Sequence, residues 1–436
     1  MLILVADIHP LGILAHFRHF ILNLLPQRWL ILIIINAVYF FVYFHRVSPA
    51  VLAPYLMEAF STTAASLGAM SSAYFYPYAL SQPIVGLLTD RWGARKVVFL
   101  STLIGSVGAL FFGLAPTLFL ASIARALIGF GAAGVFVPAL KVLLPWFGSQ
   151  AFAQMNVILL AVGNLAAIVA STPYAWLIQE MSWRSSFFLV AGITLLLAIL
   201  SLTCIQDQPA GFSPPKEEKQ RIRPAPKGRG GKIFKTRFFW SMAVLFFIYG
   251  GPFTTFQGLW GYPFLIDVHK YDKIQAGNLI MAIAFGAILG GPLLVYFAGK
   301  TFPDKKGLML SIFIGAQTFN WFCITFLGRS LSYISLGLIF FLMGTVMAGA
   351  LALYWAIVRE VSPAEKLGTV MGFLNPAPFL GVAIFQPLTG FLMDRVGKVG
   401  GAFPFEAYQH AFALCFGAVS ATFIISLFII KPGKPL

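Results

Sequence analysis

Two matching stretches decide the fold: QPIVGLLTDR at residues 82–91 and QPLTGFLMDR at residues 386–395. In each stretch a proline is followed seven residues later by an Asp-Arg pair, with mainly apolar residues between them. The same spacing leads from Pro173 to Glu180 and from Pro292 to Gly299-Lys300. Recurrence of one pattern at four places predicts an architecture built from internal repeats.

A coarser repeat divides the chain into two halves. PYLME at residues 54–58 and PFLID at residues 263–267 are 209 residues apart, as are Pro83 and Pro292. Four glycines match at an offset of 215, in the pairs Gly129 and Gly344, and Gly134 and Gly349. One pattern in helices of alternating direction is what doubled, inverted three-helix repeats leave in a sequence.

The composition places these repeats in a membrane. The 436 residues are 59% hydrophobic and only 10% charged, whereas soluble domains average about 25% charged residues. A helix needs about 20 apolar residues to span a bilayer. Twelve stretches are long and apolar enough: 29–57, 65–88, 96–115, 117–142, 151–178, 185–205, 238–266, 276–299, 307–328, 331–358, 366–394 and 407–430. We therefore expect an all-α membrane protein with twelve transmembrane helices in two pseudo-symmetric six-helix bundles.

The basic residues predict the orientation of these helices. Of 30 Lys and Arg residues, 22 fall in segments on one side and six on the other, while Arg46 and Arg125 lie within spans. Cytoplasmic loops are the ones enriched in Lys and Arg. We therefore expect both termini to be cytoplasmic in a multi-pass protein of the plasma (inner) membrane. Since the net charge of +16 follows topology, it does not indicate nucleic-acid binding.

The segments outside the bundles are polar or amphipathic. Residues 1–28 have helical spacing of apolar residues and predict an amphipathic extension on the cytoplasmic surface, with an unstructured extension as the alternative. Residues 206–237 contain nine Lys or Arg and predict a solvated basic linker, which could also contact anionic lipid headgroups. The bundles are then residues 29–205 and 238–430, followed by a tail at 431–436. We expect a monomer. The three cysteines have no metal-ligand spacing, so neither a metal nor a cofactor is predicted.

The loop after the first stretch, GLLTDRWGARK at residues 86–96, resembles the signature G-x-x-x-D-R-x-G-R-[RK]-[RK] of the major facilitator superfamily. It departs from that pattern in one respect, because Ala94 separates the second glycine from Arg95. The resemblance covers Trp29 to Ile430. It implies a latch that closes the cytoplasmic side, formed by Gly86, Asp90, Arg91, Gly93 and Arg95. The alternative interpretation is an ordinary solvated loop. Asp394-Arg395, at the other end of the membrane, is interpreted as an interfacial charge pair.

Two arginines lie inside apolar spans. Arg46 is close to the middle of the first span, within NAVYFFVYFHRVSPAVLAP at residues 36–54, and Arg125 is in the fourth. An arginine at the bilayer centre costs roughly 2.5–3.5 kcal/mol and normally faces a bundle interior or a watery cavity. Counting at ~1.5 Å per residue places both roughly 5 Å to the same side of the midplane.

None of the 14 acidic residues lies near the middle of a span. A buried guanidinium without a carboxylate requires another source of negative charge, and an anionic ligand would supply it in bidentate form. Arg125 has the alternative role of bonding to helix ends. The predicted substrate-binding residues are Arg46, Arg125, Tyr39, Tyr43, Tyr74, Tyr78, Gln257, Trp260 and Asn375.

The arginine pair resembles the anion:cation symporter branch of the superfamily. Helix 1 of that branch has an Asp-Arg pair, and helix 4 has an Arg followed by a Glu. Arg46 and Arg125 match the arginines, but His45 replaces the aspartate and Ala132 stands in place of the glutamate. In the branch those carboxylates carry the coupled proton, so their replacement leaves His45 as the coupling candidate. The alternative is that His45 packs against a neighbour.

These features predict a secondary active transporter that moves a small organic anion, of carboxylate type, by alternating access. No nucleotide-binding loop is present, so the energy is expected to come from an ion or substrate gradient. Ion-coupled symport with a proton or sodium is expected. The alternatives are transport of amino acids or short peptides, exchange of organic anions for phosphate, and a non-transporting receptor on the same scaffold. An enzyme is not expected, since no His/Asp/Glu cluster shares one depth.

Overall fold

The computed structural model describes residues 26–209, 236–301, 305–362 and 367–429. Within these ranges the chain is nearly all helical, and the one β feature is an isolated bridge between Val399 and Ala402. The all-α prediction is confirmed. Almost all of the predicted extension (1–28) and most of the predicted linker (206–237) lie outside the described residues, as does the tail (431–436).

Helices of the N-terminal half occupy residues 27–204. They are α2 (Gln27–Val47), α3 (Pro49–Ala59), α4 (Ala64–Ser72), α5 (Phe75–Trp92), α6 (Ala94–Leu114), α7 (Leu118–Ala133), α8 (Phe136–Val169), α9 (Thr172–Glu180) and α10 (Trp183–Cys204).

Helices of the C-terminal half occupy residues 237–429, and three single-turn π-helices (η2, η3, η4) and one 3₁₀ turn (η5) interrupt or end them. The elements are α12 (Arg237–Thr255), η2 (Phe256–Trp260), α13 (Gly261–His269), α14 (Lys273–Phe285), η3 (Gly286–Gly290), α15 (Gly291–Thr301), α16 (Lys306–Phe322), η4 (Cys323–Leu327), η5 (Gly328–Ser330), α17 (Tyr333–Val361), α18 (Leu367–Leu374), α19 (Ala377–Val396) and α20 (Phe405–Ile429).

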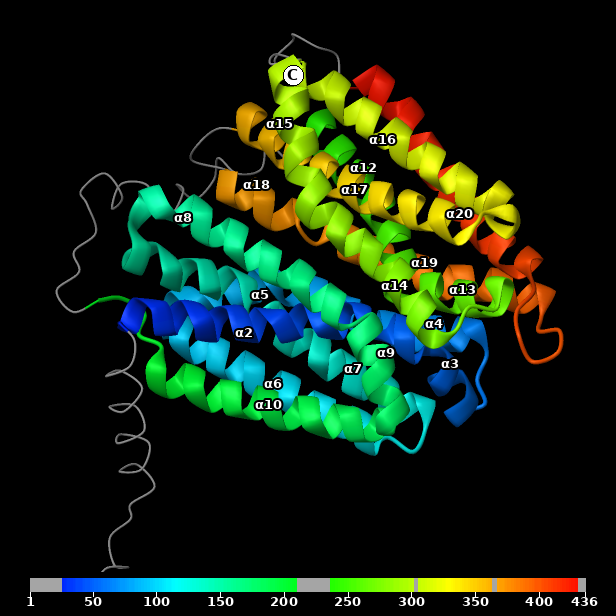
Figure 1. The fold of residues 1–436 in the computed structure, drawn as a ribbon. Coiled ribbons are helices and arrows are strands. Elements are labelled where there is room, and N and C mark those ends of the chain that lie inside the picture. Colours follow the sequence, from blue (N-terminus) through cyan, green and yellow to red (C-terminus); the bar gives the residue numbers. More distant parts are fainter. Residues whose placement is uncertain (1–25, 210–235, 302–304, 363–366, 430–436) are drawn as a thin grey trace, which may run out of the picture.

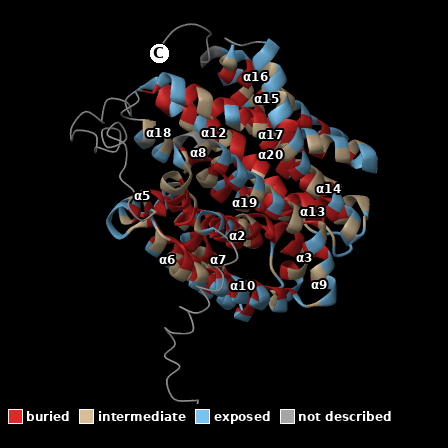
Figure 2. Cartoon of the chain, turned by 60° about the vertical axis from the view of Figure 1, so that its left-hand side comes forward, coloured by how far each residue is buried: buried red, intermediate tan, exposed pale blue. Residues whose placement is uncertain are grey.

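The described helices agree closely with the predicted spans. Ten segments are long and apolar enough to cross a membrane, and a pair bent by 44°, Gln154–Val169 with Thr172–Glu180, makes an eleventh. The remaining predicted span, 65–88, is covered by two helices, α4 and α5. Of these, α5 is more polar than the other spans because it contains Gln82, Asp90 and Arg91. Large apolar side chains on the outer helix faces are exposed, such as Phe119 and Leu80. Figure 2 shows the buried residues on the helix faces that pack against other helices.

The two halves pack together at one end and diverge at the other (Figure 1). Packing between them joins α4 and α5 to α19, α3 to η2 and α13, and α9 to α14. We call the end formed by α3, α4, α9, α13 and the last turn of α19 the sealed end. The opposite end, with the last turn of α5, the middle of α8 and the start of α18, is the splayed end. The candidate residues Arg46, in the last turn of α2, and Tyr78, in the first turn of α5, lie between these ends.

Candidate functional site

Arg46 lies in an aromatic cage that both halves build. It is in the last turn of α2, and its side chain is buried. The guanidinium carbon is 4.9 Å from the ring centroid of Tyr43, 5.3 Å from that of Tyr78 and 4.7 Å from that of Phe379. These rings come from α2, α5 and α19 respectively. A desolvated cation–π contact contributes about 2 kcal/mol, so the three rings stabilise the buried charge in part.

No carboxylate of the described residues pairs with Arg46 or Arg125. The ion pairs in these ranges join Lys141 to Asp90, Lys306 to Glu360 and Arg329 to Glu406. The Nε of Arg46 is buried and has no described hydrogen-bond partner. The positive charge of Arg46 is therefore not balanced by a carboxylate of the described residues.

Arg125 is held by a backbone carbonyl. It is almost fully buried in α7, and its Nη1 donates to the carbonyl oxygen of His45 at 2.8 Å. The residue four positions after His45 is Pro49, which has no N–H to donate, so the helix leaves this carbonyl without its usual partner. Arg125 supplies the missing donor. Its Nε and Nη2 have no described partner.

A stacked pair of tyrosines connects the two arginines. The rings of Tyr74 and Tyr78 are 5.8 Å apart with an interplanar angle of 15°. Arg125 lies 5.0 Å from the Tyr74 ring, while Arg46 lies over Tyr78. The Tyr74 hydroxyl donates to the carbonyl of Val42 at 3.1 Å. The two arginines thus contact one aromatic stack, but one of them is already bonded to the backbone.

Tyr39 completes the aromatic surface on α2. Its ring centroid is 6.5 Å from that of Tyr43. A Cβ at Gly163 of α8 would lie 3.0 Å from ring carbons of both tyrosines, so the glycine lets α8 pack directly behind them. Both tyrosines therefore share the helix face of Arg46, as their spacing predicts.

The three candidate residues of the C-terminal half differ in the partners that they contact. Asn375 donates to Gln82 across the two halves at 3.0 Å, whereas Trp260 donates to Thr389 of its own half at 2.8 Å. Gln257 is buried in η2, next to Gly258. A Cβ at Gly258 would lie 3.1 Å from the carbonyl oxygen of Arg46, so η2 passes close to the end of α2.

Helix breaks surround the cage. α2 ends at Val47, α4 ends just before Tyr74, α18 ends just before Asn375, and η2 interrupts the helix that contains Gln257. Discontinuous helices of this kind often border substrate sites in secondary transporters, because their ends present unpaired backbone groups. Phe379 and Gly258 are the site residues that the sequence did not indicate, since one phenylalanine among 45 carries no local signal.

His45 faces away from the cage. Its ring lies 5.8 Å from that of Phe187 in α10 and 6.0 Å from that of Phe44, and it is almost fully buried. Neither ring nitrogen has a described hydrogen-bond partner. A proton bound at His45 would therefore act on the arginine cage through the helix end and Arg125, not by contact.

The predicted latch residues bond within the N-terminal half. Asp90 pairs with Lys141 at 2.7 Å. Arg95 donates its N–H to Asp207 Oδ1 at 2.7 Å and its Nε to the carbonyl of Leu202 at 2.6 Å. Gly93 has a φ of +84°, a conformation that favours glycine, and the Asp207 carboxylate occupies the place of its missing Cβ.

The other two latch candidates have fewer described neighbours. Gly86 has no neighbour within 4 Å of the position its Cβ would take, and Arg91 is exposed. Asp207, which binds the start of α6, was not indicated by the sequence pattern. In this conformation the loop is thus tied to α8 and to the end of α10, away from the C-terminal half.

Comparison with known proteins adds an independent finding. Residues 35–377 match the family model of the Major Facilitator Superfamily. An uncharacterized transporter of Bacillus subtilis (strain 168), YybO, is 27% identical over 417 residues, covering 91% of this chain and 94% of that protein. A hexuronate transporter of the same organism is 25% identical over 390 residues, covering 83% and 87% of the two chains.

A solved structure shows the same fold. A bacterial homologue of the human lysosomal transporter Spinster, in an inward-facing and unoccupied conformation, has a TM-score of 0.71 to this chain. The two are 18% identical, and the match covers 94% of this chain and 99% of that one. At this identity the likeness concerns the fold alone.

Proposed function

Because the chain belongs to the Major Facilitator Superfamily, and is therefore a multi-pass membrane transporter of a small molecule and not an enzyme, we propose that its substrate is a small organic anion of the carboxylate type. The transport mechanism we propose is alternating access, in which the two halves rock around a site between them. The hexuronate transporter is named for a sugar acid, which supports an acidic substrate here.

The observation that supports this proposal most strongly is the environment of Arg46. A buried charge without a countercharge is costly, and an incoming carboxylate can offset that cost with two charge-assisted hydrogen bonds. The cage is built by α2, α5 and α19. An anion bound there would contact both halves, as alternating access requires.

Arg125 takes a supporting role in this proposal. Its bond to the His45 carbonyl fixes the end of α2, from which Arg46 projects. One guanidinium, not two, would then grip the substrate directly. Tyr39, Tyr43, Tyr74 and Tyr78 would form the walls, and Gln257, Trp260 and Asn375 would contribute from the C-terminal half, with Trp260 acting through Thr389.

Orientation and coupling complete the proposal. The positive-inside rule assigns the splayed end to the cytoplasm and both termini to the same side. Symport with a proton is proposed, with His45 as the protonated group, and sodium is the other candidate ion. The latch of Gly86, Asp90, Arg91, Gly93 and Arg95 would close the splayed end in the alternate state. The working unit is proposed to be a monomer in the plasma (inner) membrane.

Uptake by proteoliposomes tests the substrate class. Purified protein would be offered labelled sugar acids, simple monocarboxylates, amino acids and dipeptides, with and without imposed proton and sodium gradients. We expect uptake of a carboxylate and at least a 100-fold loss in Arg46→Ala, with partial recovery in Arg46→Lys. Arg329→Ala is the control, because Arg329 is exposed and pairs with Glu406, which is not a cage residue. Its uptake should equal that of the wild type.

A thermal-shift measurement with the same compounds separates binding from transport. A ligand at 100 times its Kd stabilises the folded state by about 2.7 kcal/mol, and Arg46→Ala should abolish this shift. Uptake of amino acids or dipeptides but no simple anion would support the first alternative. Uptake only into vesicles preloaded with phosphate would support exchange. Absence of uptake under every gradient would support a receptor, and wild-type uptake by Arg46→Ala would refute the arginine site.

A further inference from the structure

The Asp394 carboxylate bonds to the other half of the molecule. Asp394 lies near the end of α19, and its Oδ1 accepts the N–H of Ala64 at 2.8 Å while its Oδ2 accepts the N–H of Ala65 at 2.7 Å. These two amides open α4, where the first N–H groups of a helix have no partner within the helix. The helix N-terminus also carries partial positive charge, which favours a carboxylate.

Two glycines bring the backbones close enough for these bonds. A Cβ at Gly390, one turn before Asp394, would overlap the backbone of Ala64 and lie 2.7 Å from the nitrogen of Ala65. A Cβ at Gly68, one turn into α4, would overlap the carbonyl of Gln386. Each helix therefore presents a glycine to the backbone of the other, and larger side chains would hold them apart.

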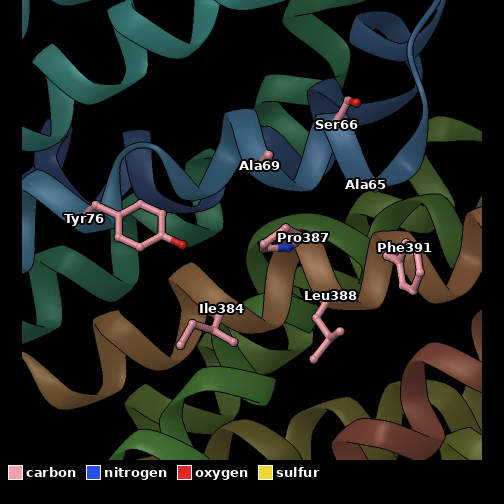
Figure 3. A pocket seen from close by; sticks show the side chains of 8 residues that line it. All are labelled: Ala65, Ser66, Ala69, Tyr76, Ile384, Pro387, Leu388 and Phe391. Carbon is pink, nitrogen blue, oxygen red and sulfur yellow. The ribbon is translucent and has the colours of Figure 1, made fainter.

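The seam between α4–α5 and α19 continues toward the cage. The Tyr76 hydroxyl donates to the carbonyl of Ala383 at 2.9 Å. An open groove of about 560 Å³ runs beside this bond, between Ser66 and Ala69 on one side and Leu388 and Phe391 on the other (Figure 3). One edge of the seam is therefore open to the outside of the protein.

The bonds of Asp394 differ in kind from the other described hydrogen bonds between the halves. The remaining described hydrogen bonds between halves join neutral groups: Tyr76 to Ala383, Thr172 to Asn278, and Asn375 to Gln82. The described ion pairs each stay within one half. Hydrogen bonds to a charged group are roughly twice as strong as neutral ones. We therefore expect Asp394 to make the strongest of the described hydrogen bonds across the seam.

We propose that Asp394 is a positioning residue for transport, a clasp whose carboxylate holds the sealed end shut and must leave α4 before that end opens. The clasp sets the balance between this conformation and one open at the sealed end. The inference rests on the proposed rocking of the halves, but it does not depend on the chemical nature of the cargo.

Asp272 provides a matched control. It caps α14 at the same end of the molecule, accepting the N–H groups of Ile274 and Gln275 at 2.9 and 2.8 Å. Its carboxylate and its helix belong to the same half. Removal of either cap should lower thermal stability to a similar degree, but only the loss of Asp394 should change how the halves are placed.

Spin-label distances test the clasp directly. Nitroxide labels at Glu180→Cys and Val399→Cys would report on the sealed end, since both sites are exposed and lie in different halves. The three native cysteines are buried and would be replaced by alanine. In nanodiscs without substrate, we expect Asp394→Ala and Asp394→Asn to raise the population with the longer distance about tenfold, and Asp394→Glu to restore much of the wild-type distribution.

Distances in Asp394→Ala and Asp394→Asn that match those of Asp272→Ala would overturn the proposal. Should Asp394→Ala fail to fold, Asp394→Asn decides, because its amide oxygen keeps one acceptor while the charge is lost. The readout needs no cargo. If the Asp394 variants shift the distance population tenfold but the protein transports no anion, the clasp is supported and the proposed substrate class is wrong. If the protein takes up an anion but the variants leave the distances unchanged, the substrate class is supported and the clasp is wrong.

Discussion

Residues 82–91 and 386–395 have nearly the same sequence but opposite surroundings. In the second stretch Asp394 binds two amides of the other half, and Gly390 lies against the backbone of Ala64. In the first stretch Asp90 pairs with Lys141 of its own half, and Gly86 has no close neighbour. Similar local sequence therefore produces the same helix with a polar end, whereas the position of that end relative to the other half determines what its aspartate binds.

The difference follows from inverted symmetry. The two stretches run in opposite directions, so their Asp-Arg ends lie at opposite ends of the molecule. Of the two Asp-Arg ends, only Asp394-Arg395 has described hydrogen bonds to the other half in this conformation, because it lies at the sealed end. Gln82, at the start of the other copy, bonds to Asn375 across the halves. We expect the copy at 82–91 to make the equivalent contacts when the splayed end closes, and the following variants test that expectation.

The largest effect is expected from a side chain in the seam. Gly390→Val should place methyl groups on the backbone of Ala64, and overpacking of this kind costs about 1–3 kcal/mol. Gly86→Val is the matched variant and should cost little in this conformation, because its site is open. Thermal unfolding and the label distance at the sealed end measure both. Equal shifts in the two variants would contradict the comparison.

An intermediate change in stability is expected from replacing Gln82 and Gln386, the first residues of the two stretches. The expected change has opposite signs at the two positions. Gln82 accepts a hydrogen bond from Asn375, and a typical bond of this kind contributes about 1 kcal/mol. Gln82→Leu should therefore lower the unfolding temperature. Gln386 is fully buried and its amide has no described partner, so Gln386→Leu should be neutral or stabilising. A clear loss of stability in Gln386→Leu would show that its amide bonds to a group such as buried water.

The smallest effect is expected at the ion pair of the first stretch. Lys141 and Asp90 have side chains 47% and 73% exposed, and exposed pairs contribute about 0–1 kcal/mol. Lys141→Met should therefore change the free energy of unfolding less than Asp394→Ala does, as measured by thermal unfolding at low salt. A loss of stability as large as that of Asp394→Ala would mean that the two stretches contribute equally to the free energy of unfolding in this conformation.

Many residues of the site could be predicted from the sequence, but the residues that they contact in the other half could not. The tyrosines on the Arg46 face followed from helical spacing, and a bond from Arg125 to a helix end was among the expected roles. Pro49, four residues after His45, is the sequence signal for that bond. Phe379 lies more than 300 residues from Arg46 in the chain and could not be paired with it by any local pattern. Asp394, expected as an interfacial charge pair, instead binds α4.

Hydropathy and residue spacing were enough to predict the helices, the apolar spans and the internal repeat, because a segment in lipid must satisfy its backbone hydrogen bonds within its own helix. Hydropathy and residue spacing are local properties, so they can be read directly from the sequence. The rings that surround Arg46 and the aspartate that bridges the halves could be identified only from the packing of the two bundles. Those contacts depend on how two similar bundles are placed relative to each other.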